Sequence, residues 1–120
     1  MTIDAITAVI PVMPVKDFEM ALAWYTKLLG RAPDLMPMEG VAEWQLADSA
    51  FVQLSQDEQR AGATSLVIAV ENVDTQRDTL VAEGFSVSDI EEYPGVVKLM
   101  VLPDPEGNEI TFVQDISGSE

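Results

Sequence analysis

The segment "VKDFEMALAWYTKLLG", residues 15–30, decides the fold because a similar order of signals returns later in the chain. Asp17 can accept hydrogen bonds from the unpaired N–H groups at the start of a helix, and Gly30 can end that helix. Apolar residues recur between them at helical spacing: Phe18, Ala21, Leu22, Tyr25, Leu28 and Leu29. This spacing predicts an amphipathic helix with one side packed against a sheet.

The second copy is "VENVDTQRDTLVAEG", residues 70–84. Asn72 or Asp74 can cap this helix at its start, and Gly84 can end it. Its predicted apolar side consists of Val73, Leu80 and Val81.

Short strand-like segments surround both predicted helices. They are residues 6–13, 33–37, 42–47 and 50–55 in the first half, and residues 65–70, 85–90, 96–102 and 108–114 in the second. The sequence therefore predicts two βαβββ modules, about residues 1–58 and 63–116, within a single domain over residues 1–120. Such modules indicate an α+β fold in which a curved sheet surrounds a cavity and the helices lie on the outer face.

The composition excludes several classes of partner. Six basic and 21 acidic residues give a net charge of −15, which repels nucleic acid and anionic membrane surfaces and attracts cations. The apolar start of the chain has no basic residue before Lys16, so it predicts a first strand rather than a signal peptide. No apolar run approaches the ~20 residues that span a bilayer, and we expect a cytoplasmic protein.

The chain contains neither cysteine nor histidine. Disulfides, thiolate metal sites and cysteine nucleophiles are therefore excluded. The absence of histidine removes the commonest general base and the commonest protein ligand of zinc, nickel and iron.

The segment "AEWQLADSAFVQLS", residues 42–55, predicts a hairpin with a two-residue turn at Asp48 and Ser49. That turn would pair Trp44 with Gln53 and Leu46 with Phe51, and opposed residues share a face of a sheet. The predicted cavity-facing side chains are therefore Trp44, Leu46, Phe51 and Gln53. Val52, Leu54 and Glu43 would point to the opposite side.

The segment "LPDPEGNEITFV", residues 102–113, combines a turn with the last strand. Ile110 and Phe112 suit the core, so Glu109, Thr111 and Val113 are predicted to face the cavity. In the preceding strand Lys98 and Met100 share a face and are also candidate ligand contacts. The alternatives are that Trp44 and Phe51 pack at an interface, that Met100 fills the core and that Lys98 is solvated.

Residues 11–30, 70–85 and 102–112, together with the module order, resemble the vicinal oxygen chelate superfamily, which includes glyoxalase I, extradiol dioxygenases and bleomycin resistance proteins. In its metal-dependent members, four cavity-facing strands each supply one His, Glu or Gln ligand. The resemblance places these positions at Ile10, Gln53, Ser65 and Thr111. Only Gln53 is a plausible ligand, so we expect no metal and no cofactor.

The resemblance leads to our first hypothesis, a metal-free small-molecule-binding protein similar to the bleomycin resistance branch. It would be a homodimer that sequesters a cationic or aromatic ligand, as in antibiotic resistance. The expected ligand-binding residues are Trp44, Phe51, Gln53, Lys98, Met100 and Thr111.

Two other functions stay open. The chain could be a lyase, isomerase or dioxygenase-like enzyme that uses Glu43 or Glu109, or a scaffold domain that only dimerises. A cavity-facing Lys98 would favour an anionic substrate and would count against a cationic ligand.

Overall fold

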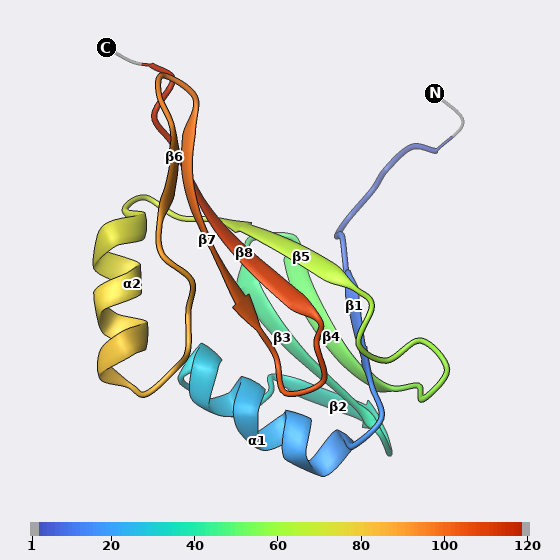
Figure 1. Cartoon of the computed structure of the whole chain (residues 1–120). Helices are drawn as coiled ribbons and strands as arrows, with labels where there is room; N and C mark the ends of the chain where they lie inside the picture. The colour runs from blue at the N-terminus through green and yellow to red at the C-terminus, as the bar shows by residue number, and fades with distance from the viewer. Residues whose placement is uncertain (1–2, 119–120) are drawn as a thin grey trace. The chain divides into compact units, whose positions relative to one another are not determined.

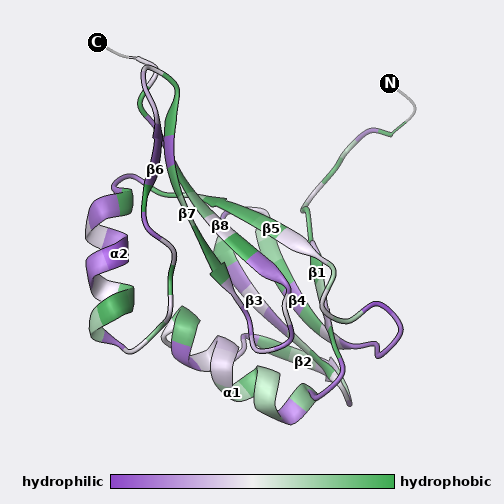
Figure 2. Ribbon diagram, viewed as in Figure 1, coloured by the Kyte–Doolittle hydropathy of each residue, from purple (hydrophilic) through white to green (hydrophobic). Residues whose placement is uncertain are grey.

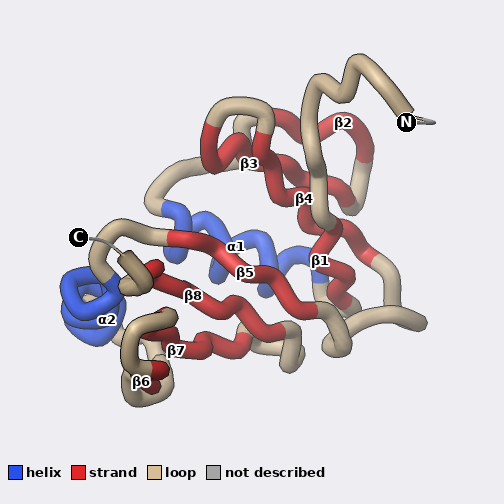
Figure 3. Tube along the Cα trace, turned by 90° about the horizontal axis from the view of Figure 1, so that it is seen from above, coloured by secondary structure: helices blue, strands red, loops and turns tan. Residues whose placement is uncertain are grey.

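The computed structural model describes residues 3–118, and the chain divides into two compact units, Met1–Gly62 and Ala63–Glu120. Within the described residues, each unit contains one four-stranded sheet and one helix in the order βαβββ (Figure 1 and Figure 3). The predicted α+β class and its two βαβββ modules are therefore confirmed.

The first unit consists of β1 (Val12–Val15), α1 (Phe18–Leu29), β2 (Leu35–Met38), β3 (Val41–Ala47) and β4 (Ala50–Gln56). Its strand order is β1-β4-β3-β2, with β1 parallel to β4 and the other neighbours antiparallel. The carboxylate of Asp17 accepts the N–H of Met20 at 3.1 Å, and Gly30 ends α1 with a φ of 77°. Both predicted helix signals are thus confirmed.

The core of the first unit lies between α1 and one face of the sheet. Phe18, Ala21 and Tyr25 of α1 are buried. The buried strand residues of this unit are Met13, Pro14, Val15, Ala42, Trp44, Val52 and Leu54. Because successive strand residues alternate between faces, all of these except Pro14 lie on the face that carries α1.

The second unit consists of β5 (Ser65–Ala69), α2 (Val73–Ala82), β6 (Glu91–Tyr93), β7 (Val97–Pro103) and β8 (Glu109–Asp115), with strand order β5-β8-β7-β6. The Asn72 side chain caps α2 by accepting the N–H of Thr75 at 3.0 Å. Figure 2 shows α2 as a largely hydrophilic helix. Val73 and Leu80 are buried, but Val81 is 49% exposed, so its predicted place on the apolar side is wrong.

A hydrogen-bonded turn connects β7 to β8. Asp104 and Asn108 are both buried, and the Asp104 carboxylate accepts the backbone N–H groups of Glu106 and Asn108. The Asn108 side chain accepts the N–H of Thr64 at 3.0 Å, next to the start of β5. The turn therefore holds β8 in register beside β5, where the two strands run parallel.

Two strand predictions differ from the structure. β1 begins at Val12, and the predicted segment 6–13 contributes an isolated bridge at Val9. Residues 85–90 form no strand, and β6 follows at Glu91–Tyr93. The Ser88 N–H donates to the carbonyl of Val101 in β7, but the Val101 N–H donates to the Ser88 hydroxyl and not to a backbone carbonyl, so the backbone pairing of a strand is not completed. In the part of the chain that the structure describes, neither helix has the length or apolarity needed to cross a membrane.

Candidate functional site

The β3–β4 hairpin contains a bulge. Ala47 pairs with Ala50 across the predicted turn, but the register then shifts between Gln45 and Ala47, so Leu46 is an extra residue in β3. Gln45 consequently lies opposite Phe51 instead of Leu46. A shift of one residue moves every following side chain of β3 to the other face.

Because of the bulge, Trp44 lies on the other face of the sheet from the one predicted. Trp44 lies opposite Val52, and not opposite Gln53 as predicted. It is 0% exposed, its ring centroid lies 6.3 Å from that of Tyr25 in α1, and its Nε1–H donates to the Arg31 carbonyl at 3.0 Å. Trp44 is therefore a core residue on the helix-bearing face, where its apolar ring is removed from water.

The face of the first sheet that does not carry α1 holds the remaining predicted residues of this hairpin. We call it the helix-free face of the first unit. Its residues on β1, β2, β3 and β4 are Val12, Pro14, Leu35, Met38, Val41, Glu43, Gln45, Phe51, Gln53 and Ser55. Phe51 and Gln53 thus lie together as predicted, but Trp44 is not with them.

Glu43 lies on this helix-free face, so the prediction that it points to the helix side is wrong. It is directly opposite Gln53, whose Nε2–H donates to the Glu43 carboxylate at 3.1 Å. Val12 flanks Gln53 on β1, and Leu35 flanks Glu43 on β2. A carboxylate–amide pair therefore lies between two aliphatic side chains that are 43% and 53% exposed.

This arrangement has no local signal in residues 42–55. A bulge is often marked by a glycine with a positive φ, and residues 42–55 contain no glycine. Only the contacts of Trp44 with α1 and with the α1–β2 loop reveal the register, and these contacts are distant in sequence.

The face assignment of β8 is confirmed. Ile110 and Phe112 are buried, and Thr111 pairs with Val67 on one side and Val101 on the other. Thr111 and its neighbours at alternate positions therefore lie on the face of the second sheet that does not carry α2, the helix-free face of the second unit. The role of Thr111 in binding a ligand stays a prediction.

Lys98 and Met100 share a face, as predicted, but it is the face that carries α2. Met100 is fully buried opposite Phe112, and the Lys98 ammonium group donates a hydrogen bond to the carboxylate of Asp74 in α2. That hydrogen bond raises the pKa of Lys98 above its ordinary value. The prediction that both residues lie on the helix-free face is thus wrong, because at these alternate positions of β7 the side chains point toward α2.

The positions that the sequence resemblance aligned with metal ligands carry an unsuitable donor set. They hold an aliphatic side chain at Ile10, an amide at Gln53, and two neutral hydroxyls at Ser65 and Thr111. First-row divalent metals need imidazole, thiolate or carboxylate donors for tight binding. Within residues 3–118, no group of three or more acidic side chains is arranged to hold a metal ion. These residues do not fit the metal centre of the metal-dependent members.

Most basic side chains are paired with carboxylates. Among the described residues the ion pairs are Lys16–Glu58, Arg31–Asp34, Arg60–Asp57, Arg77–Asp89 and Lys98–Asp74. Lys27 lies in the last turn of α1. In contrast, the helix-free faces carry Glu43 and Glu109. Their charge therefore complements a cation better than an anion.

The likeness of the chain to known proteins is found in solved structures. No protein-family model matches the chain, and no curated protein matches it. A glyoxalase/bleomycin resistance protein from Catenulispora acidiphila is 31% identical, with a TM-score of 0.81 over 89% of this chain and 96% of that chain.

Two more distant structures share the fold. The antibiotic binding protein TnmS3 from a Streptomyces species is 21% identical, with a TM-score of 0.76 over 96% of this chain and 98% of that one. Lactoylglutathione lyase from Agrobacterium tumefaciens is 16% identical, with a TM-score of 0.73 over 88% and 91%. On the first match and the βαβββ repeat, the chain belongs to the glyoxalase/bleomycin resistance protein family, within the vicinal oxygen chelate superfamily.

Proposed function

We propose that this protein is a metal-free small-molecule-binding protein that sequesters an organic cation with an apolar body. The observation that carries the proposal is the row Val12, Gln53, Glu43 and Leu35 across the helix-free face of the first unit. Its centre is a carboxylate hydrogen-bonded to an amide, and its two ends are exposed aliphatic side chains.

Each part of the row has a distinct role in this proposal. Glu43 would attract the cationic group, and Gln53 would orient the carboxylate through its amide N–H while its carbonyl oxygen accepts a ligand donor. Val12, Leu35 and Phe51 would cover the apolar body, with about 25 cal/mol gained for each Å² of apolar surface removed from water. The net charge of −15 would increase the rate of encounter with a cation and make that rate fall with added salt.

The position of Lys98 supports a cation over an anion. On the helix-free face this ammonium group would have favoured an anionic ligand, but it is bound to Asp74 on the helix-bearing side. The metal-free state is supported by the donor chemistry at Ile10, Ser65 and Thr111, which offers no charged ligand.

We further propose a cytoplasmic homodimer that confers resistance to a cationic antibiotic by holding it. A second copy would cover apolar side chains that one copy leaves exposed, such as Met36 and Met38 on the edge strand β2. The absence of cysteine is consistent with a reducing compartment.

The proposal is tested by a thermal-shift screen with cationic, neutral and anionic aromatic compounds, including metal-free bleomycin. A ligand at ~100 times its Kd stabilises the folded state by ~2.7 kcal/mol. We expect stabilisation by cations, a smaller shift for Glu43→Gln, and no change for the control Glu19→Gln, which removes the same charge from exposed α1 surface. Stabilisation by anions alone would contradict the proposal.

The Glu43–Gln53 pair also favours a second candidate, an enzyme of the same superfamily in which Glu43 is a general base. A carboxylate oriented by a hydrogen bond can accept a proton from a bound substrate. In that case Glu43→Gln would abolish turnover and leave binding of a neutral substrate intact, whereas a binding protein shows no turnover in either form.

A further inference from the structure

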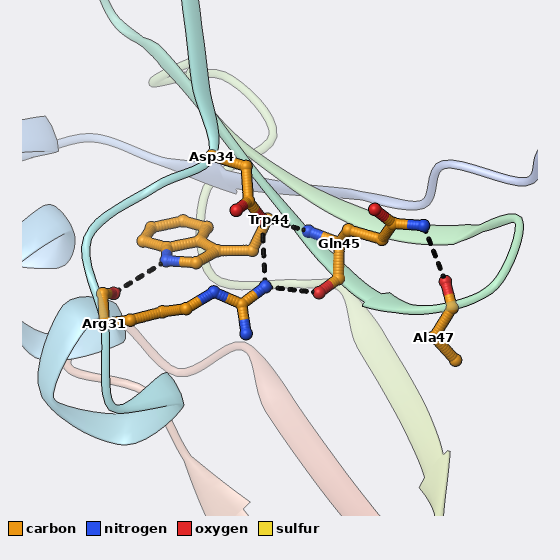
Figure 4. A network of polar contacts seen from close by, with 5 residues as sticks. All are labelled: Arg31, Asp34, Trp44, Gln45 and Ala47. Carbon is orange, nitrogen blue, oxygen red and sulfur yellow. Dashed lines mark hydrogen bonds and ion pairs between the residues drawn. The ribbon is translucent and has the colours of Figure 1, made fainter.

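The loop between α1 and β2 binds β3 at the bulge through two charged side chains (Figure 4). The Asp34 carboxylate accepts the backbone N–H of Gln45 at 2.7 Å, and the Arg31 guanidinium donates to the carbonyl oxygen of the same residue. Arg31 and Asp34 are joined at 2.9 Å. The two side chains thus satisfy both backbone polar groups of Gln45, and we call this arrangement the Gln45 clamp.

The clamp takes the place of a strand partner for β3 just before β2 begins at Leu35. The N–H of Asp34 donates to the carbonyl of Glu43 at 2.9 Å, which is the last backbone bond between this edge and β3. Gln45, two residues further along, directs its N–H and C=O to the same edge. Without the clamp these groups would have only water as a partner at this edge, and the strand end would be less strongly held.

The clamp also contacts the residue that sets the face of β3. The carbonyl of Arg31 accepts the Trp44 Nε1–H, so the α1–β2 loop binds both Trp44 and Gln45. With Trp44 inside, strand alternation places Glu43 on the helix-free face beside Gln53. In a hairpin without the bulge, Trp44 would oppose Gln53 and Glu43 would face the helix.

We propose that Asp34 is a positioning residue for Glu43. With Arg31 it holds the bulged register of β3, and the binding consequence of this role rests on the proposed function above. Asp34 touches no ligand in this proposal and acts through the Gln45 backbone. Its own ion pair is half exposed, so its importance lies in the backbone hydrogen bonds and not in the charge pair alone.

The test compares Asp34→Ala with Asp34→Asn and with the control Asp57→Ala. The control removes another Arg–Asp pair with the same i,i+3 spacing in the same unit, Arg60–Asp57. NMR of the full chain would measure cross-strand Hα–Hα contacts, which the observed register places between Glu43 and Gln53 and between Gln45 and Phe51.

We expect Asp34→Ala to weaken both Hα contacts and to lower affinity for metal-free bleomycin by up to about fivefold, the loss expected when the Glu43 charge is removed, because Glu43 is no longer held in place. Asp34→Asn keeps an acceptor for the Gln45 N–H and should recover most of both signals, and Asp57→Ala should change neither. Unaltered Hα contacts in Asp34→Ala would overturn the proposal.

The two measurements separate the two proposals. If the unaltered protein binds no cation but Asp34→Ala loses the Hα contacts, the proposed function fails and the clamp stands. If Asp34→Ala does not fold, Asp34→Asn and Arg31→Lys decide, because Arg31→Lys keeps the charge and loses the planar fork. Hα contacts in Arg31→Lys that match those of the unaltered protein, or a loss in Asp57→Ala as large as that in Arg31→Lys, would contradict the clamp.

Discussion

Replacing Trp44 with alanine should unfold or strongly destabilise the first unit and should not act as a simple loss of ligand contact. Trp44 is fully buried, packs near Tyr25 and donates a hydrogen bond to the Arg31 carbonyl. Removal of a buried Trp side chain costs about 3–5 kcal/mol through lost burial and the cavity left behind. Since whole domains have about 5–15 kcal/mol of stability, this is a large share.

Trp44→Phe separates the two parts of this cost. It keeps an aromatic ring beside Tyr25 but leaves the Arg31 carbonyl without its indole partner, so we expect a loss of about 1–2 kcal/mol. Trp24→Phe is the control, because Trp24 is only partly buried on α1 and should cost less than about 1 kcal/mol.

Urea unfolding followed by far-UV circular dichroism measures these differences, because it does not depend on the tryptophan that is removed. The order of stability should be unaltered protein, then Trp24→Phe, then Trp44→Phe, then Trp44→Ala. If Trp44→Ala costs less than about 1 kcal/mol and instead weakens ligand binding in the folded protein, Trp44 lines a binding surface and is not a core residue.

Three further predictions concern acid stability, assembly and metal content. The backbone N–H of Gln45 and, after it, Arg31 lower the pKa of Asp34 below its usual 3.8. The ionised carboxylate therefore stabilises the folded state above pH 3.8, and this contribution is lost as the pH falls further. The acid unfolding curve of Asp34→Asn should be flatter in this lower pH range, and a curve identical to that of the unaltered protein would contradict this. Light scattering should give a mass about twice that of the 13.1 kDa chain, against a monomer mass if no dimer forms. Elemental analysis after purification without chelator should find no stoichiometric zinc, nickel or iron, and finding one would revive the metal-dependent hypothesis.

The module order and the helices could be predicted because their signals are local. Asp17, Gly30 and Asn72 occupy the capping positions that their side chains or backbone freedom favour. The alternation in β8 was also sufficient, because Ile110 and Phe112 are unambiguous apolar residues with no bulge between them.

The candidate site could be predicted only in part, because faces depend on register and on what packs above them. The turn at residues 48–49 was placed correctly, but the extra residue Leu46 exchanged Trp44 and Glu43 between faces. For Lys98 and Met100 the shared face followed from spacing, whereas the side that receives α2 did not. Period-two patterns give the relative orientation of residues and leave the absolute orientation to tertiary contacts.

We propose that Glu43 selects a cation on the helix-free face of the first unit. The most direct test of this proposal is a calorimetric titration with an aryl trimethylammonium compound and with its neutral tert-butyl isostere, which has nearly the same shape. Each would be titrated into the unaltered protein and into Glu43→Gln, with Glu19→Gln as the charge control.

We predict that the cation binds the unaltered protein more tightly than the isostere does. Glu43→Gln should weaken cation binding by about 1 kcal/mol, roughly fivefold, and should leave the affinity for the isostere unchanged. This loss lies between that of an exposed ion pair and that of a buried charged hydrogen bond. Equal affinity of both compounds for the unaltered protein, or the same loss of cation affinity in Glu19→Gln as in Glu43→Gln, would contradict the claim.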